Sequence, residues 1–128
     1  MSIIRHKGYF AFFIVGAIGA LLMLLLPADA FSTEFSRLFN QYKWFDKVGH
    51  IGLFFILALS IFKAFLLRRR TLIVIITLLA LCTEIAQSNM GGARTGSIGD
   101  FAADLGGLLF ALAWLGYWVK NELHGQNR

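Results

Sequence analysis

The chain has 128 residues, of which 58% are hydrophobic, and it contains 13 phenylalanines but a single proline. Together with a mean hydropathy of +0.70, this composition excludes a soluble globular protein of this size and indicates an integral membrane protein. The formal net charge is +5, but the lysines and arginines stand in short runs beside apolar segments. That distribution is a membrane-topology signal and argues against nucleic-acid binding.

The first predicted helix covers residues 8–26, an uninterrupted apolar run that follows Arg5 and Lys7. At about 1.5 Å per residue, such a helix crosses a hydrocarbon core of about 30 Å. Ala28 and Ala30 imitate a signal-peptidase site behind it. The apolar region of a cleavable signal usually has about 7 to 15 residues, so this longer run favours a retained membrane helix.

Residues 31–47 form an amphiphilic segment after this helix. Its apolar positions 31, 35, 38, 39 and 42 recur at helical spacing, and the Ser32–Thr33–Glu34 sequence offers N-terminal capping groups. Two interpretations stay open at this point. The segment is either a short interfacial helix lying on the bilayer surface or a tightly packed connecting loop.

Three more apolar segments predict membrane-spanning helices at residues 48–67, 71–87 and 101–119. A tight basic turn at residues 68–70 joins the first two of them. The last segment ends in Trp114, Tyr117 and Trp118, which are residue types typical of the membrane interface. The predicted fold is therefore all-α, a single domain over residues 1–128 that forms a polytopic bundle of four transmembrane helices.

The distribution of basic residues predicts the orientation of this bundle. The side that holds both termini and the turn at 68–70 carries Arg5, Lys7, Lys63, Arg68, Arg69, Arg70, Lys120 and Arg128. The opposite side carries only Arg37, Lys43, Lys47 and Arg94. Because loops rich in lysine and arginine stay inside the cell, both termini are predicted to be cytoplasmic.

Three of the predicted helices each present a pair of polar residues to the outer leaflet. The pairs are Asp46 with His50, Glu84 with Gln87, and Asp100 with Asp104, and members of a pair are three or four residues apart, on one helix face. Glu84 would stand about 18 Å along its helix, with about 12 Å of hydrocarbon core above it. Since a carboxylate at that depth cannot face lipid, we expect it inside the bundle.

Individual residues of this polar region have competing interpretations. Asp100 follows Ser97 by three residues at a helix start, where an acid can serve as a cap or belong to a site. Asp104 lies one turn deeper, beyond the reach of capping. Arg94 either neutralises the acids or binds a ligand with them. The Gly106–Gly107 pair predicts close packing of a neighbouring helix.

Metal and nucleophile motifs are weak in this sequence. Neither His-x-x-x-His nor Cys-x-x-Cys spacing occurs, so a structural zinc site is not predicted. A hard divalent cation at Glu84, Asp100 and Asp104 is chemically reasonable but only weakly indicated. Phosphate-binding, dinucleotide-binding and nucleophile-elbow motifs are missing as well. We therefore predict no metal and no cofactor.

The polar motifs resemble the signature of VanZ-like membrane proteins. The matching residues are Asp46-Lys47-x-x-His50-x-Gly-x-Phe54, then Glu84-x-x-Gln87, then Arg94-x-x-Ser97-x-x-Asp100-x-x-x-Asp104-x-x-Gly107, which together span about half of the chain. One position departs, because the family pattern usually has Asn where this chain has Asp104. The acid adds a charge that the site must balance or protonate.

The resemblance implies a setting more than a reaction. VanZ-like proteins are named for a protein associated with resistance to the glycopeptide teicoplanin, which implies the bacterial cytoplasmic (inner) membrane. Carried over position by position, the residues expected to bind a ligand are Asp46, Lys47, His50, Glu84, Gln87, Arg94, Ser97, Asp100 and Asp104.

Three functions fit these residues. The preferred one is a binding protein whose outward-facing polar pocket holds an envelope lipid, a cell-wall precursor or a glycopeptide. The second is a membrane enzyme that uses Glu84 or His50 as general acid or base. The third is a structural or transport bundle whose acids pair with Arg94. The expected partners are the lipid bilayer and such a ligand, without nucleic acid, and the oligomeric state stays open.

Overall fold

The computed structural model describes residues 7–25, 34, 37, 41–65, 67–89 and 96–125. The long helices in these ranges are α1 (Lys7–Leu25), α3 (Lys43–Phe65), α4 (Arg69–Asn89) and α5 (Ile98–Gly125). The described part of the chain contains no strand. The prediction of an all-α protein is therefore confirmed for these residues.

Three of these helices are long and apolar enough to cross a membrane, over Trp44–Phe65, Arg69–Asn89 and Ile98–Tyr117. They correspond to the segments predicted at 48–67, 71–87 and 101–119. The helix α3 starts earlier than predicted, at Lys43, so the end of the amphiphilic segment 31–47 belongs to a spanning helix. Residues 31–33, 35, 36 and 38–40 of that segment lie outside the described residues, as do Ala28 and Ala30.

The helix α1 has 19 residues and contains a shorter apolar stretch, Phe10–Gly19. It packs along α3, where Gly16 and Gly19 lie against the side chains of Leu57 and Leu53. At the other end of this contact, the ring of Phe13 lies edge-on to Phe65 with the centroids 5.6 Å apart. Small residues and aromatic edges thus hold α1 against α3.

The apolar core lies between α3, α4 and α5. Its buried members are Phe54, Leu57, Ala58 and Ile61 of α3, Leu72, Ile76 and Ala80 of α4, and Leu108, Ala111 and Leu115 of α5. Their spacing of three and four residues places them on one face of each helix. The same face of α4 continues into the buried Glu84 and Gln87, so the polar site extends directly from the core.

Close contact between α3 and α5 depends on Gly107. A Cβ atom at this position would meet the carbonyl oxygen of Ile51 and would lie 2.9 Å from Cβ of Phe54. At Gly106 the nearest atom would be Cγ1 of Ile51 at 3.7 Å, an ordinary contact. The predicted role of the glycine pair in helix packing is therefore confirmed for Gly107.

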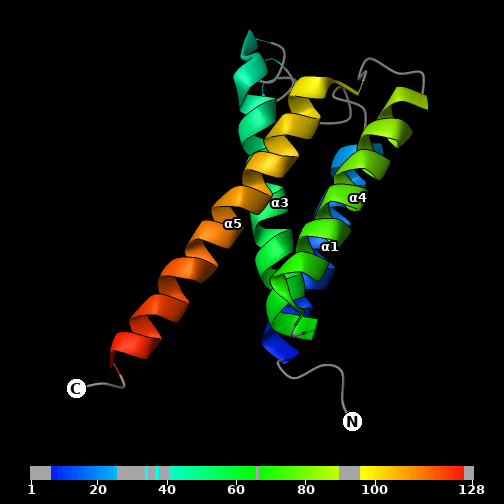
Figure 1. Ribbon diagram of the computed structural model, residues 1–128. Helices are drawn as coiled ribbons and strands as arrows, with labels where there is room; N and C mark the ends of the chain where they lie inside the picture. The colour runs from blue at the N-terminus through cyan, green and yellow to red at the C-terminus, as the bar shows by residue number, and fades with distance from the viewer. Residues whose placement is uncertain are drawn as a thin grey trace.

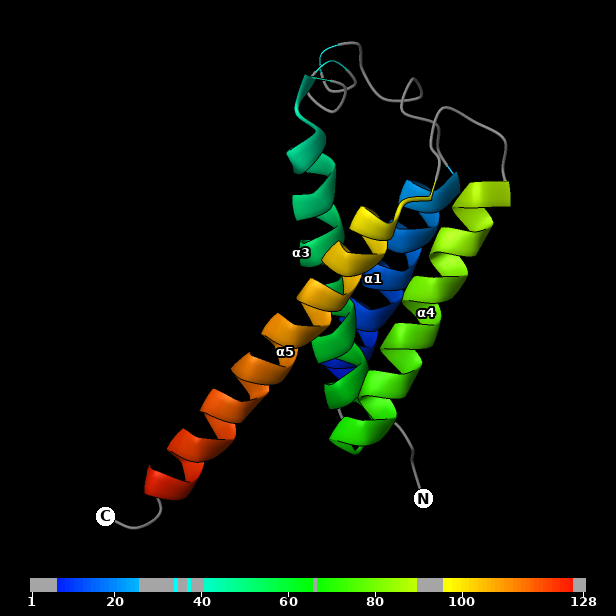
Figure 2. The same ribbon diagram turned by 45° about the horizontal axis from the view of Figure 1, so that its top comes forward.

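The two ends of the bundle differ in composition (Figures 1 and 2). The start of α3, the end of α4 and the start of α5 lie at one end, at the top of Figure 1. The start of α1, the turn between α3 and α4 and the end of α5 lie at the other. Arg68, Arg69 and Arg70 are exposed at this turn. The acidic pairs predicted to lie together therefore gather at the end opposite the basic turn.

Candidate binding site

The start of α5 is fixed by a cap that also reaches α3. The Oγ of Ser97 accepts a hydrogen bond from the backbone amide of Asp100 at 3.1 Å and donates one to Oδ2 of Asp100 at 2.7 Å. Nζ of Lys47 donates to Oδ1 of the same carboxylate at 2.9 Å. Asp100 therefore serves as a helix-start residue, one of its two predicted roles, and ties α5 to α3 as well.

One turn deeper, His50 and Asp104 form a second tie between the same helices. Nδ1 of His50 and Oδ1 of Asp104 are 2.7 Å apart. The Asp104 side chain is fully buried, and His50 is 6% exposed. When Asp104 is ionised, Nδ1 is the donor, which fixes the histidine tautomer and leaves Nε2 without that proton.

Glu84 reaches the same region from α4 and is 8% exposed. The backbone of Gly96 packs against it so closely that a Cβ there would lie 2.8 Å from Oε2 of Glu84. Gln87, on the next turn of α4, is buried too. The prediction that Glu84 lies inside the bundle is therefore confirmed.

Two buried oxygens in this cluster are not satisfied by the described residues. They are Oε1 of Glu84 and Oδ2 of Asp104, and neither has a hydrogen-bond partner there. A buried carboxylate oxygen without a donor costs free energy, so each of these atoms requires a partner beyond the described residues: a donor from the rest of the chain, a proton, a water molecule, a cation or a ligand group.

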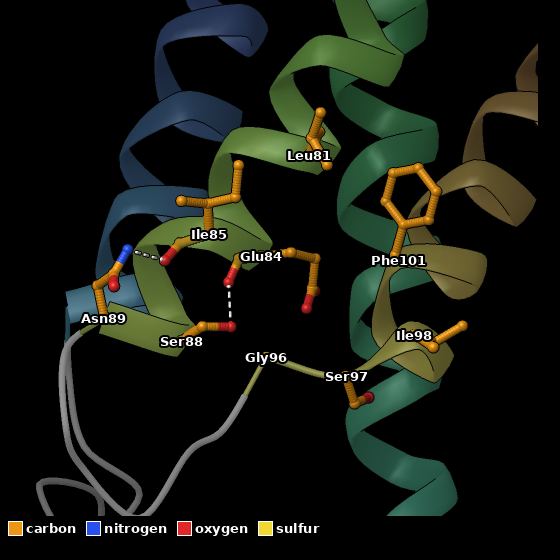
Figure 3. Close-up of a pocket in the computed structure, with 9 residues that line it drawn as sticks. All are labelled: Leu81, Glu84, Ile85, Ser88, Asn89, Gly96, Ser97, Ile98 and Phe101. Atoms are coloured by element: carbon orange, nitrogen blue, oxygen red, sulfur yellow. Dashed lines mark hydrogen bonds between the residues drawn. The ribbon is translucent and has the colours of Figure 1, made fainter.

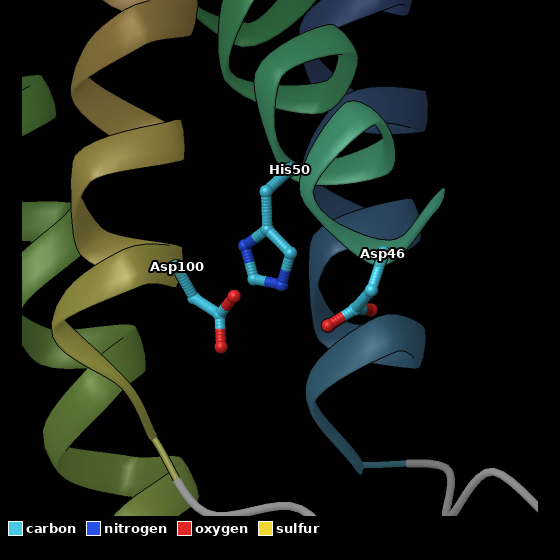
Figure 4. Close-up of side chains that lie close together, drawn as sticks. All are labelled: Asp46, His50 and Asp100. Carbon is cyan, nitrogen blue, oxygen red and sulfur yellow. The ribbon is translucent and has the colours of Figure 1, made fainter. Parts of the chain in front are cut away.

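The titratable residues form two overlapping groups that share His50. In the outer group, ligand atoms of Asp46, His50 and Asp100 lie within 4.8 Å of one another, and in the inner group the same holds for His50, Glu84 and Asp104. Figure 4 shows the His50 ring between the carboxylates of Asp46 and Asp100. The histidine therefore connects the mouth of the cluster to its buried floor.

The described cluster carries an excess of negative charge. Its carboxylates are those of Asp46, Glu84, Asp100 and Asp104, against the lysine Lys47 and the histidine His50. In a membrane interior such an excess must be balanced, because isolated ions are poorly solvated there. Arg94, predicted to supply part of the balance, lies outside the described residues.

A pocket of about 340 Å³ opens between α4 and α5 beside this cluster (Figure 3). Its polar lining consists of Glu84, Ser88, Asn89 and Ser97, with the backbone of Gly96. Its apolar lining consists of Leu81, Ile85, Ile98 and Phe101. The pocket thus joins a polar floor to an apolar wall, which matches the chemistry of an amphiphile.

The structure brings together most of the residues predicted to form the site. Asp46, Lys47, His50, Glu84, Ser97, Asp100 and Asp104 meet at one end of the bundle. Ser88, Asn89 and the apolar wall were not predicted. No sequence signal marks them, because apolar residues on a membrane helix ordinarily face lipid and serine or asparagine is common near helix ends.

Comparisons of the chain with protein-family models, with curated proteins and with solved structures find no match. Function is therefore inferred from the geometry of the site itself. The resemblance to VanZ-like proteins stays a prediction from the motif residues.

Proposed function

We propose that the protein is a binding protein of the bacterial cytoplasmic membrane. In this proposal its polar cluster and the adjoining pocket hold the head group of an amphiphile, such as an envelope lipid, a cell-wall precursor or a lipophilic glycopeptide. The motif resemblance to VanZ-like proteins links this ligand class to teicoplanin resistance. In the same proposal α1 is a fourth membrane span, and both termini face the cytoplasm.

The observation that carries the proposal is the hydrogen-bonding state of the pocket. Ser88 Oγ donates to the carbonyl oxygen of Glu84 at 2.8 Å, and Asn89 Nδ2 donates to that of Ile85 at 2.9 Å. Ser88 Oγ and one N–H of Asn89 are therefore engaged within α4. Glu84 lines the pocket, and its buried Oε1 has no hydrogen-bond partner among the described residues. A carboxylate in the lining of this pocket favours a head group that donates hydrogen bonds, through hydroxyl or ammonium groups.

The apolar wall supports a ligand that enters from the bilayer. Ile85 is 53% exposed and Ile98 is 89% exposed, although both line the pocket. In a membrane these exposed side chains face acyl chains, so a lipid tail can lie along them while its head group reaches Glu84. These exposed apolar side chains in the pocket lining favour an amphiphile over a water-soluble solute.

The proposal is tested by native mass spectrometry of protein purified in mild detergent from bacterial membranes. Ile85→Trp fills the pocket mouth, and Val74→Trp is its matched control, because Val74 lies on the same helix, outside the pocket, and is 57% exposed. We expect the wild-type protein and Val74→Trp to retain an amphiphile with a hydroxyl-rich or amine-bearing head group, and Ile85→Trp to lose it. Equal retention by all three proteins overturns the proposal.

A second candidate function is favoured by the contact between His50 and Asp104. A carboxylate hydrogen-bonded to one imidazole nitrogen prepares the other nitrogen for general acid or base chemistry, and Glu84 lies within 4.8 Å of this pair. An enzyme that acts on the bound amphiphile would use these groups. In that case Glu84→Gln retains ligand binding while the conversion of the bound molecule stops.

A further inference from the structure

We propose that His50, Glu84 and Asp104 bind a divalent transition-metal cation. The three residues come from α3, α4 and α5, and one ligand atom of each lies within 4.8 Å of the others. An imidazole and carboxylates supplied by three separate helices are a ligand set that such ions accept. The inference concerns the floor of the cluster, which shares Glu84 with the pocket, and it rests on the three ligand residues and not on the identity of the pocket ligand.

The unpaired oxygens select the inner group over the outer one. Oε1 of Glu84 and Oδ2 of Asp104 are buried without a hydrogen-bond partner among the described residues. In the outer group, by contrast, both oxygens of Asp100 are already hydrogen-bonded, to Lys47 and Ser97. A cation at the inner group satisfies two otherwise costly atoms and displaces one existing bond, between His50 and Asp104. One at the outer group would displace the bonds of Asp100 to both Lys47 and Ser97.

Charge and distance agree with this assignment. Two carboxylates and a neutral imidazole carry two negative charges, which a divalent cation balances in a region where His50, Glu84 and Asp104 are each at most 8% exposed. Ligands about 2.1 Å from an ion lie at most about 4.2 Å apart, so small side-chain rotations close the group. Binding at Nδ1 replaces the proton that now links His50 to Asp104, and that proton is released to solvent.

The ligand set also indicates which ion is bound. An imidazole beside two carboxylates suits Mn²⁺, Fe²⁺ or Zn²⁺, whereas Ca²⁺ and Mg²⁺ prefer a shell made only of oxygen atoms. Mn²⁺ is the useful probe, because its electron paramagnetic resonance spectrum reports binding and its coupling to ¹⁴N reports a histidine ligand.

In the experiment, a chelator first strips any bound metal from the full-length protein in detergent. The chelator is then removed, and Mn²⁺ is titrated into the protein. We expect one bound ion per chain with ¹⁴N coupling, and weaker binding by at least about 10- to 100-fold in Glu84→Gln and Asp104→Asn. Glu34→Gln is the matched control. Glu34 is exposed, and its substitution removes one negative charge outside the cluster.

Three results overturn the proposal. They are the absence of a bound ion in folded wild-type protein, a bound ion without ¹⁴N coupling, and a greater loss of affinity in Asp46→Asn than in Glu84→Gln. Size-exclusion chromatography and thermal melting in chelator show whether each variant is folded. If Asp104→Asn does not fold, the affinities of Glu84→Gln and Asp46→Asn decide between the inner and the outer group, because His50 belongs to both groups and ¹⁴N coupling does not separate them. The assay contains no lipid ligand, so its failure leaves the proposed pocket function to its own test.

Discussion

Asp100 and Asp104 stand one turn apart on the same face of α5, yet their surroundings differ. Asp100 is bonded through both oxygens, to Ser97 and to the partly exposed Lys47. Asp104 is fully buried, has one oxygen on His50, and leaves the other without a described partner. Both oxygens of the outer carboxylate are therefore hydrogen-bonded within the protein. One oxygen of the inner carboxylate remains available to a proton, a cation or a ligand.

This contrast indicates that the outer and inner pairs on the first turns of α5 contribute differently to stability. The outer pair fastens the start of the helix, and the Lys47 side chain is 42% exposed, so water screens the charge of the pair and its contribution to stability is small. The inner pair lies where charges are poorly solvated, so removing one partner leaves the other without compensation. Substitutions at the two levels should therefore differ several-fold in their effect.

The largest expected effect follows from His50→Ala. This change removes the His50 donor from the buried Asp104 carboxylate, and breaking such a buried pair costs about 3–5 kcal/mol. Thermal and denaturant unfolding in metal-free detergent should show the loss. The control is Asp104→Asn, which keeps an oxygen acceptor for His50 and removes the buried charge. Equal losses of stability in His50→Ala and Asp104→Asn would contradict the view that the uncompensated charge of Asp104 causes the effect.

A smaller effect is expected from Gly107→Ala, which tests the helix contact that places both carboxylates. The added methyl group would press on backbone and Cβ atoms of α3, and overpacking of this kind typically costs about 1–3 kcal/mol. Gly106→Ala has room at an ordinary contact distance and should leave the melting temperature nearly unchanged. If Gly106→Ala is the more damaging variant, the packing described for α3 and α5 is wrong.

The smallest effect is expected from Lys47→Ala at the outer level. The lysine side chain is 42% exposed, and pairs exposed to this degree contribute about 0–1 kcal/mol. The same melting assay should therefore place this variant close to the wild-type protein. A loss as large as that of His50→Ala would show that the outer pair is not screened by water and that the two levels do not differ.

Much of this arrangement follows from the sequence. The length of the apolar runs predicts the helices. The depth of Glu84 along its helix places this residue inside the bundle, and Ser97 three residues earlier places Asp100 at a helix start. The pairing itself was not predictable, because helix spacing does not say which acid meets Lys47 and which meets His50. That choice depends on how far α3 and α5 are shifted along each other, and the close contact at Gly107 sets the shift.

The start of α3 and the apolar wall of the pocket also could not be predicted from the sequence. Aromatic and charged residues before position 48 are compatible with a surface segment as well as with a helix end. Only the structure therefore shows that α3 begins at Lys43. Ile85 and Ile98 look like ordinary lipid-facing residues until α4 and α5 are placed side by side, where both line the pocket.

A crystal structure of the protein, purified with its native lipids and crystallised in a lipidic phase, shows directly whether this end of the bundle binds an amphiphile. We expect a non-protein group within hydrogen-bond distance of the Glu84 carboxylate, with an apolar tail along Ile85 and Phe101. A Glu84 carboxylate closed off by protein alone, for example by the guanidinium of Arg94, would contradict the claim that this end of the bundle is a binding site.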